Sequence, residues 1–193
     1  MAITRAVASS ITQGLPKSKS TLSGNLPILS GSYESIATVT VGAGGQSTVS
    51  FTSIPSTYKH LQLRCSIMNT TTNNPRFTLN NDTIGANYYM HSIYNNNPNV
   101  STYNEANNAG GIAFAYNEST TSPTASITDI LDYSNTNKYK TSRIMSGYDA
   151  NGTGYIFYRS GLWMSTSAVN RIDITSTGGN LAQYSSFALY GIL

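Results

Sequence analysis

The chain has 193 residues, enough for one domain with a buried core, and a net charge of +3 from 11 Lys and Arg against 8 Asp and Glu. Charged residues make up only 10% of it, while Tyr, Ser, Thr and Asn abound, and this favours strands joined by hydrated turns over a disordered chain. The single cysteine, Cys65, excludes an intrachain disulfide and therefore a small disulfide-stapled scaffold.

Residues 1–32, MAITRAVASSITQGLPKSKSTLSGNLPILSGS, predict an extended arm rather than a folded element. They hold two prolines, no acidic residue and no strand periodicity, and only residues 3–13 suit a short helix. Apolar side chains are spread along this segment without a core of their own, so we expect the arm to dock on another protein. The docking residues that we assign are Ile3, Arg5, Val7, Ile11, Leu15, Lys17, Lys19, Leu22, Leu26 and Ile28.

The charge of the arm favours an acidic protein surface over nucleic acid as its partner. All of the chain's excess positive charge lies in residues 1–20, but three spaced cations without interleaved aromatic residues are a weak signal for nucleic acid. The arm lacks the apolar run of about 7–15 residues of a signal peptide. Nothing in the sequence approaches the roughly 20 apolar residues of a membrane span. We therefore expect folding in a cytoplasm and no membrane partner.

Residues 33–193 predict one all-β domain. TVSFTSI, HLQLRCSI, PRFTLN and NRIDIT alternate between apolar and polar residues, which places Cys65 in the core beside Leu63 and Ile67. Further strands are expected in YESIATVTV, NYYMHSIY, GIAFAY, ASITDILDY, KTSRIMSGY, GYIFYRSGLWM and SSFALYGIL. Ten or eleven short strands between turn-rich clusters indicate an antiparallel β-sandwich, with a jelly roll as the leading topology.

One stretch, NNNPNVSTYNEANNAGG at residues 95–111, reads as a long polar loop. Its simplest interpretation is a hydrated loop. The alternative is a contact surface, because tyrosine rings and asparagine amides suit carbohydrate or protein recognition. The residues that we assign to such a ligand loop are Asn96, Asn97, Tyr103, Asn104 and Glu105.

The titratable residues give no pattern for catalysis. His60 is expected on the polar face of its strand, and His91 is expected to pack or form hydrogen bonds within YYMHSIY. Asp129 and Asp132 are three residues apart, which on a strand places them on opposite faces and excludes a paired acid and base.

Two glycine-rich segments are expected to be hairpin turns. GAGGQS lacks the Gly-Lys-Ser/Thr ending of a phosphate-binding loop. DANGTG resembles the start of a calcium loop, but Ser160 stands where the bidentate glutamate should fall, so a turn on Asn151-Gly152 explains it better. We therefore expect no enzyme activity, no metal and no cofactor.

Three runs carry a resemblance to a known family: SSITQGLPKSKSTLSGN, YESIATVTVGAGGQSTVSFTSIPSTYKHLQLR and the ending AVNRIDITSTGGNLAQYSSFALYGIL. In these runs the chain resembles small virion structural proteins of tailed bacteriophages. Residues 69–160 resemble them only in general composition. The resemblance implies a β-sandwich displayed on the surface of a phage particle and attached through its N-terminal arm. It transfers no catalytic residue.

Three functions follow as hypotheses. The first is a capsid decoration or cement protein, whose arm binds the major capsid protein or another virion protein, and which we expect to form a homo-oligomer. The second is a receptor-binding module of a tail or head fibre that contacts host surface glycans. The third, a glycan-cleaving enzyme, needs a carboxylate pair that the spacing does not offer. The sequence lacks the coiled-coil, Gly-X-Y or β-helical repeats of a fibre shaft, which favours the first.

Overall fold

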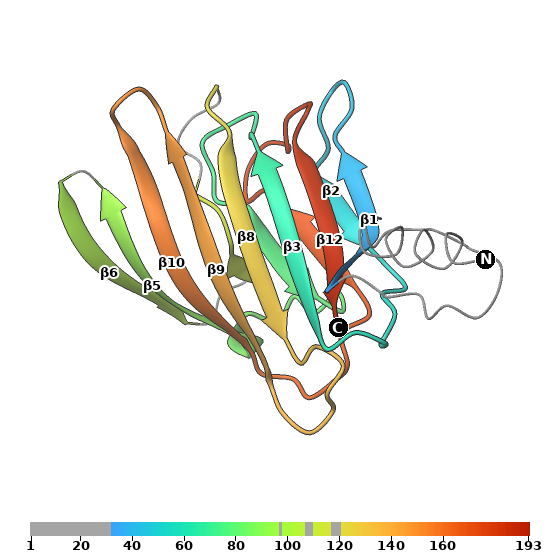
Figure 1. Cartoon of the computed structure of the whole chain (residues 1–193). Coiled ribbons are helices and arrows are strands. Elements are labelled where there is room, and N and C mark those ends of the chain that lie inside the picture. The colour runs from blue at the N-terminus through green and yellow to red at the C-terminus, as the bar shows by residue number, and fades with distance from the viewer. Residues whose placement is uncertain (1–31, 97, 107–109, 117–120) are drawn as a thin grey trace, which may run out of the picture.

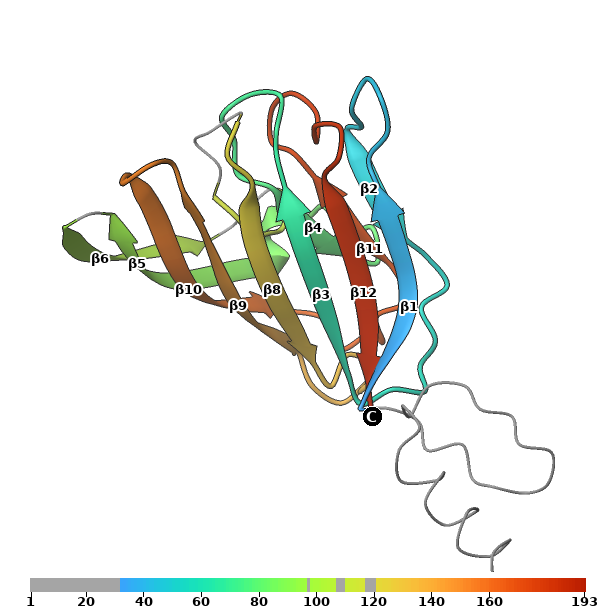
Figure 2. The same ribbon diagram turned by 45° about the horizontal axis from the view of Figure 1, so that its top comes forward.

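A computed structural model of the chain describes residues 32–96, 98–106, 110–116 and 121–193 (Figure 1). Its strands form two antiparallel sheets (Figures 1 and 2). The strands are β1 (Tyr33–Thr40), β2 (Thr48–Phe51), β3 (His60–Ile67), β4 (Arg76–Leu79), β5 (Tyr88–Asn96), β6 (Asn99–Ala106), β7 (Ile112–Ala113), β8 (Thr124–Leu131), β9 (Lys140–Asp149), β10 (Gly154–Trp163), β11 (Ile172–Thr175) and β12 (Ser186–Ile192). A short 3-10 helix, Gly85–Asn87, precedes β5. No helix among the described residues is long and apolar enough to span a membrane.

Eight of the strands form a jelly roll. One half-sheet has the order β1-β12-β3-β8, and the smaller sheet that faces it has the order β2-β11-β4-β7. The chain crosses between the sheets at each step from β1 to β4, and again on leaving β7 and on either side of β11. This is the double Greek-key winding of a jelly roll. The predicted β-sandwich with jelly-roll topology is therefore confirmed.

Two hairpins add four strands to the first half-sheet. β9 pairs with β8, β10 pairs with β9 and β5, and β6 pairs with β5, so the larger sheet continues as β8-β9-β10-β5-β6. The β9–β10 turn is built on Asn151 and Gly152, whose φ angles are +59° and +92°, as predicted. We call the four strands β9, β10, β5 and β6 the extension. It continues the larger sheet on the side away from β1 (Figure 2).

The prediction of a loop at residues 95–111 is wrong for most of this segment. β5 continues to Asn96, and Asn99–Ala106 is the edge strand β6. Six of the eight residues of β6 are exposed and the other two are only partly buried, so its sequence carries no apolar–polar alternation. Strand β7 is also shorter than predicted, because GIAFAY is paired only at Ile112–Ala113.

The core lies between the two sheets and follows the predicted alternation. Leu61, Leu63 and Ile67 of β3 are almost completely buried, and Cys65 is buried with them, as predicted. Phe77 of β4 and Ile174 of β11 face them from the smaller sheet.

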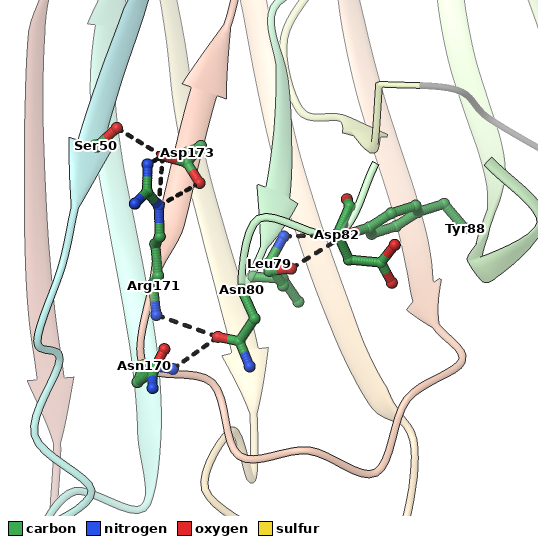
Figure 3. Close-up of polar contacts among 8 residues, drawn as sticks. All are labelled: Ser50, Leu79, Asn80, Asp82, Tyr88, Asn170, Arg171 and Asp173. Carbon is green, nitrogen blue, oxygen red and sulfur yellow. Dashed lines mark hydrogen bonds and ion pairs between the residues drawn. The ribbon is translucent and has the colours of Figure 1, made fainter. Parts of the chain in front are cut away.

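Polar contacts fasten the smaller sheet on its outer side (Figure 3). The Arg171 guanidinium donates to both carboxylate oxygens of Asp173 at 2.7–2.9 Å, and the Ser50 hydroxyl donates to the same carboxylate at 2.6 Å. Burial raises the pKa of Asp173, but these hydrogen bonds and the Arg171 charge outweigh it and hold the pKa below its usual value. β2 and β11 are thereby joined by side chains as well as by their backbone.

A second group of contacts joins the turn after β4 to the larger sheet (Figure 3). The Tyr88 hydroxyl accepts from the Leu79 amide at 3.0 Å and donates to the Asp82 carbonyl at 2.9 Å. The Trp163 indole N–H donates to the Asp82 carboxylate at 2.7 Å. Because Tyr88 lies on β5 and Trp163 on β10, these bonds hold the base of the extension against the smaller sheet.

Candidate functional site

The extension and the smaller sheet enclose a hollow of about 400 Å³. Its lining comes from β5 and β10 of the larger sheet, the edge strand β6, the start of β4 with the chain leading into it, and β7 with the segment that follows it. The lining residues are Asn74, Arg76, Met90, Tyr94, Tyr103, Glu105, Ala113, Tyr116, Tyr155, Phe157 and Arg159. We call this feature the aromatic hollow.

Phe157 lies at the centre of a cluster of aromatic rings that lines the aromatic hollow. The Tyr94 ring stacks on it with centroids 5.1 Å apart and planes 19° apart, and the Tyr155 ring does so at 5.7 Å and 15°. The Tyr116 ring is tilted against both, at 5.1 Å from Phe157 and 4.9 Å from Tyr155. Tyr103, on β6, is 50% exposed. The hollow thus combines a packed aromatic base with an exposed ring.

Strand alternation places these rings on one face. In β10, Tyr155, Phe157 and Arg159 face the hollow, whereas Ile156 and Tyr158 point to the other side and are 56% and 58% exposed. The register pairs Phe157 with Tyr94 across the β10–β5 ladder. Cross-strand neighbours on one face of a sheet are close enough for aromatic contact.

Tyr116 reaches the cluster from the segment after β7. Gly111 begins that segment with a φ of +91°, and a Cβ atom there would lie 2.0 Å from the Phe77 carbonyl oxygen. Only glycine tolerates this close approach to β4. The Arg76 guanidinium also donates to the Gly111 carbonyl at 3.2 Å. The position of residues 111–116 against β4, and so of the Tyr116 ring, depends on this glycine.

Two arginines and one glutamate supply the charges of the hollow. Arg76 donates to both oxygens of Glu105 at 3.0 and 3.4 Å. The Arg159 guanidinium carbon lies 4.0 Å from the centre of the Phe157 ring, and Arg159 is only 7% exposed. Burial, followed by the nearby Arg76 charge, lowers the pKa of Arg159 to about 10, an effect that Glu105 opposes. Arg159 therefore stays protonated at neutral pH.

The structure divides the residues of the predicted ligand loop. Tyr103 and Glu105 line the aromatic hollow. Asn104 lies between them on the opposite face of β6, where it pairs with His91 of β5. Asn96 ends β5. Asn97 lies outside the described residues, as do all ten residues assigned to the docking arm.

The other residues weighed for chemistry lie apart from the hollow. Asp129, on β8, accepts from the Gln62 amide at 2.8 Å. Asp132 lies beyond the end of β8, where its backbone N–H donates to His60 Nδ1 at 2.9 Å and its carboxylate pairs with Lys138. His91 lies on the outer face of β5. In the part of the chain that the structure describes, no group of three or more His, Cys, Asp or Glu could hold a metal ion.

Most of the hollow was missed in the sequence. Tyr94, Tyr116, Phe157 and Arg159 come from parts of the chain that are far apart in sequence. The β10–β5 pairing brings three of them together, and the segment after β7 adds Tyr116. A local signal existed in YIFYR, where Tyr155, Phe157 and Arg159 occupy alternate positions. Two aromatic residues and one cation on the same face of a strand indicate a surface that combines apolar and charged groups.

A depression of about 630 Å³ lies on the opposite face of the extension. Its apolar part is a row of paired side chains, Ile127, Met145, Tyr158 and Ile93, each 39–58% exposed. Asp129 and Arg143 border the row. This depression is lined by only one tyrosine, so it offers less stacking surface to a small ligand than the aromatic hollow does.

The aromatic hollow is suited to noncovalent recognition of a small polar molecule. It supplies flat rings for stacking, an amide at Asn74, and guanidinium and carboxylate groups for hydrogen bonds. No protein-family model matches this chain, and no curated protein matches it either. Function is therefore inferred from the hollow and from the residue patterns of the chain itself.

Proposed function

We propose that the protein is a carbohydrate-binding jelly-roll module carried on a bacteriophage particle, with the aromatic hollow as its sugar site. The observation that carries this proposal is the group of rings around the hollow, in which half-exposed Tyr103 faces the same space as Tyr94, Tyr116 and Tyr155. This is the second of the functions that the sequence suggested.

The chemistry of a sugar matches these groups. A pyranose ring has flat faces of C–H groups, which stack on aromatic rings, and an edge of hydroxyl groups, which exchange hydrogen bonds with amides, carboxylates and guanidiniums. Tyrosine suits this task because it provides a large rigid surface with two side-chain torsions to restrict. In the hollow, rings and hydrogen-bonding groups lie within one space of about 400 Å³.

Core packing accounts for only part of the cluster. Phe157 is 6% exposed and serves as an ordinary buried residue. Tyr103 is 50% exposed on an edge strand, where a polar side chain would be the usual choice. An exposed aromatic ring beside a hollow that contains two arginines is typical of a binding surface.

The location on a phage particle rests on the resemblance in residues 9–25, 33–64 and 168–193. In this proposal residues 1–32 attach the protein to the major capsid protein or another virion protein, and the β-sandwich projects from the particle. Capsid decoration is the second candidate function. It is favoured by the apolar and basic composition of residues 1–32, and it is compatible with sugar binding because the two roles use different parts of the chain.

The test is a glycan array of bacterial surface polysaccharides probed with the full-length protein and two variants. Tyr103→Ala removes the exposed ring of the hollow. Tyr158→Ala is the matched control, because Tyr158 is 58% exposed on the opposite face of the same sheet. We expect binding to at least one glycan class, loss of that signal in Tyr103→Ala and retention in Tyr158→Ala. Absence of binding to every glycan, or equal loss in both variants, would overturn the proposal.

A further inference from the structure

The aromatic hollow contains a buried cation, Arg159, that forms no ion pair with any described residue. Arg76 is neutralised by Glu105 at 3.0 Å, but no carboxylate among the described residues forms an ion pair with Arg159. The hydrogen bond that Arg159 makes is a long one, from Nη1 to the Ala113 carbonyl at 3.4 Å. Its Nε–H is buried, and no described residue accepts from it.

Burying the Arg159 guanidinium without an anion costs folding free energy, and a bound anionic ligand would offset that cost. Arg159 is only 7% exposed, so its guanidinium loses hydration, and stacking on Phe157 restores only part of that loss. The lowered pKa of Arg159 reflects the same cost, since burial is its largest cause. Two guanidiniums and one carboxylate leave the hollow with one net positive charge.

We infer that the hollow recognises an anionic sugar, one that carries a carboxylate, phosphate or sulfate group which pairs with Arg159. The inference rests on the proposed sugar-binding function and narrows its ligand class. The planar guanidinium offers N–H groups that match the oxygens of such anions, and charge-assisted hydrogen bonds are about twice as strong as neutral ones. The rings hold the sugar body, and Arg159 selects its charged substituent.

Arg159 lies beside the aromatic rings, so we expect the anionic group to be a substituent of the sugar that stacks on those rings. Arg159 follows Phe157 on the same face of β10, and its neighbours across the ladder are Ile144 and Ser92, so rings and cation share one wall. Glu105 lies in the same space and would repel an anion placed beside it. An anionic group is therefore directed to the Arg159 side of the hollow.

The test is isothermal titration of the full-length protein with matched saccharides. The probes are a hexuronate oligomer, the same oligomer with its carboxylates reduced to neutral hydroxymethyl groups, and the neutral oligomer phosphorylated or sulfated at the same position. We expect the charged forms to bind about ten- to hundred-fold tighter than the neutral one, the range for one charge-assisted hydrogen-bonded contact. The three charged forms separate carboxylate, phosphate and sulfate as the source of the anion.

Two variants and salt complete the design. Arg159→Gln should reduce the ratio of charged to neutral affinity to about one, while Arg143→Gln, on the opposite face of the sheet and 71% exposed, should leave it unchanged. Should Arg159→Gln fail to fold, the wild-type ratio and its decrease at high salt still decide the question. Equal affinity for charged and neutral forms overturns this inference alone. Failure to bind any saccharide here and on the array overturns the proposed function as well.

Discussion

Arg76 of the smaller sheet donates to both carboxylate oxygens of Glu105 on the edge strand of the larger sheet, at 3.0 and 3.4 Å. The two side chains are 13% and 22% exposed, so solvent screens the pair only in part. This contact connects β4 with β6, an edge strand whose backbone pairs with β5 alone. The bridge therefore sets the width of the aromatic hollow.

Glu105→Gln should weaken this closure. We expect a loss of about 1–3 kcal/mol in the free energy of unfolding, because the largely buried Arg76 guanidinium is left without its counter-charge. Urea denaturation measures the loss, and amide hydrogen exchange should increase in β5 and β6. The double variant Arg76→Gln/Glu105→Gln should recover part of the stability. A single variant as stable as the wild type, with unchanged exchange, would show that the bridge does not hold the extension.

Core substitutions should show that the jelly roll is stabilised by its alternating apolar strands. Leu63 and Phe51 are 1% and 3% exposed in the two facing sheets, and replacing either by Ala should cost about 2–5 kcal/mol through the cavity left behind. Ile156→Ala, at a site 56% exposed, is the control and should change stability by less than about 0.5 kcal/mol. Chelators and reductants should leave the melting temperature unchanged, and a sharp decrease with either would contradict this account of the fold.

Acid should destabilise the protein through Asp82 and Asp173. Burial alone would raise the pKa of each, but hydrogen bonds from Trp163, the Ile84 amide and Asn87 in the first case, and from Arg171 and Ser50 in the second, lower it. A folded-state pKa below the unfolded one contributes stability that is present above the unfolded pKa, about 4, and is lost as pH falls through the folded pKa.

The measurement is the free energy of unfolding between pH 7 and pH 3. The wild type should lose stability as the pH falls below about 5, and Asp82→Asn and Asp173→Asn should each be less stable at pH 7 with a shallower slope. A slope that neither substitution changes would assign the acid sensitivity to other carboxylates.

The jelly roll could be predicted from the sequence because several of its strands, among them β2, β8 and β12, bury every second residue. Strands such as HLQLRCSI show their burial directly as alternation, and the buried thiol of Cys65 followed from the same phase. The arrangement of these strands in two facing sheets then follows from general rules on sheet packing and strand connection.

The aromatic hollow could not be predicted in the same way. Its edge strand β6 buries neither face, so Tyr103 and Glu105 appeared to belong to a loop. Phe157 and Tyr94 are 63 residues apart and become neighbours only through the β10–β5 pairing. Arg159 is buried beside the Ala113 carbonyl, which belongs to the other sheet, and nothing in its local sequence indicates this contact.

Removal of residues 2–30 should leave the β-sandwich intact. β1 begins at Tyr33 and is held along its length by β12, so the deletion leaves every strand of the described residues in place. We expect a soluble protein with an unchanged melting temperature that no longer attaches to purified phage particles. Co-sedimentation with particles that lack the native protein measures attachment, with the full-length chain as control. Full occupancy by the truncated protein would show that residues 2–30 are not the anchor.

Methionine methyl resonances give the most direct test that sugars bind in the aromatic hollow. Met90 lines the hollow and is 3% exposed, whereas Met145 lies on the opposite face of the same sheet and is 46% exposed. The protein is labelled with ¹³C at its methionine methyl groups and titrated with the tightest-binding saccharide from the array. The account predicts that the Met90 resonance shifts to saturation while that of Met145 stays in place. A shift of Met145 with an unmoved Met90 would place the sugar on the outer face and contradict it.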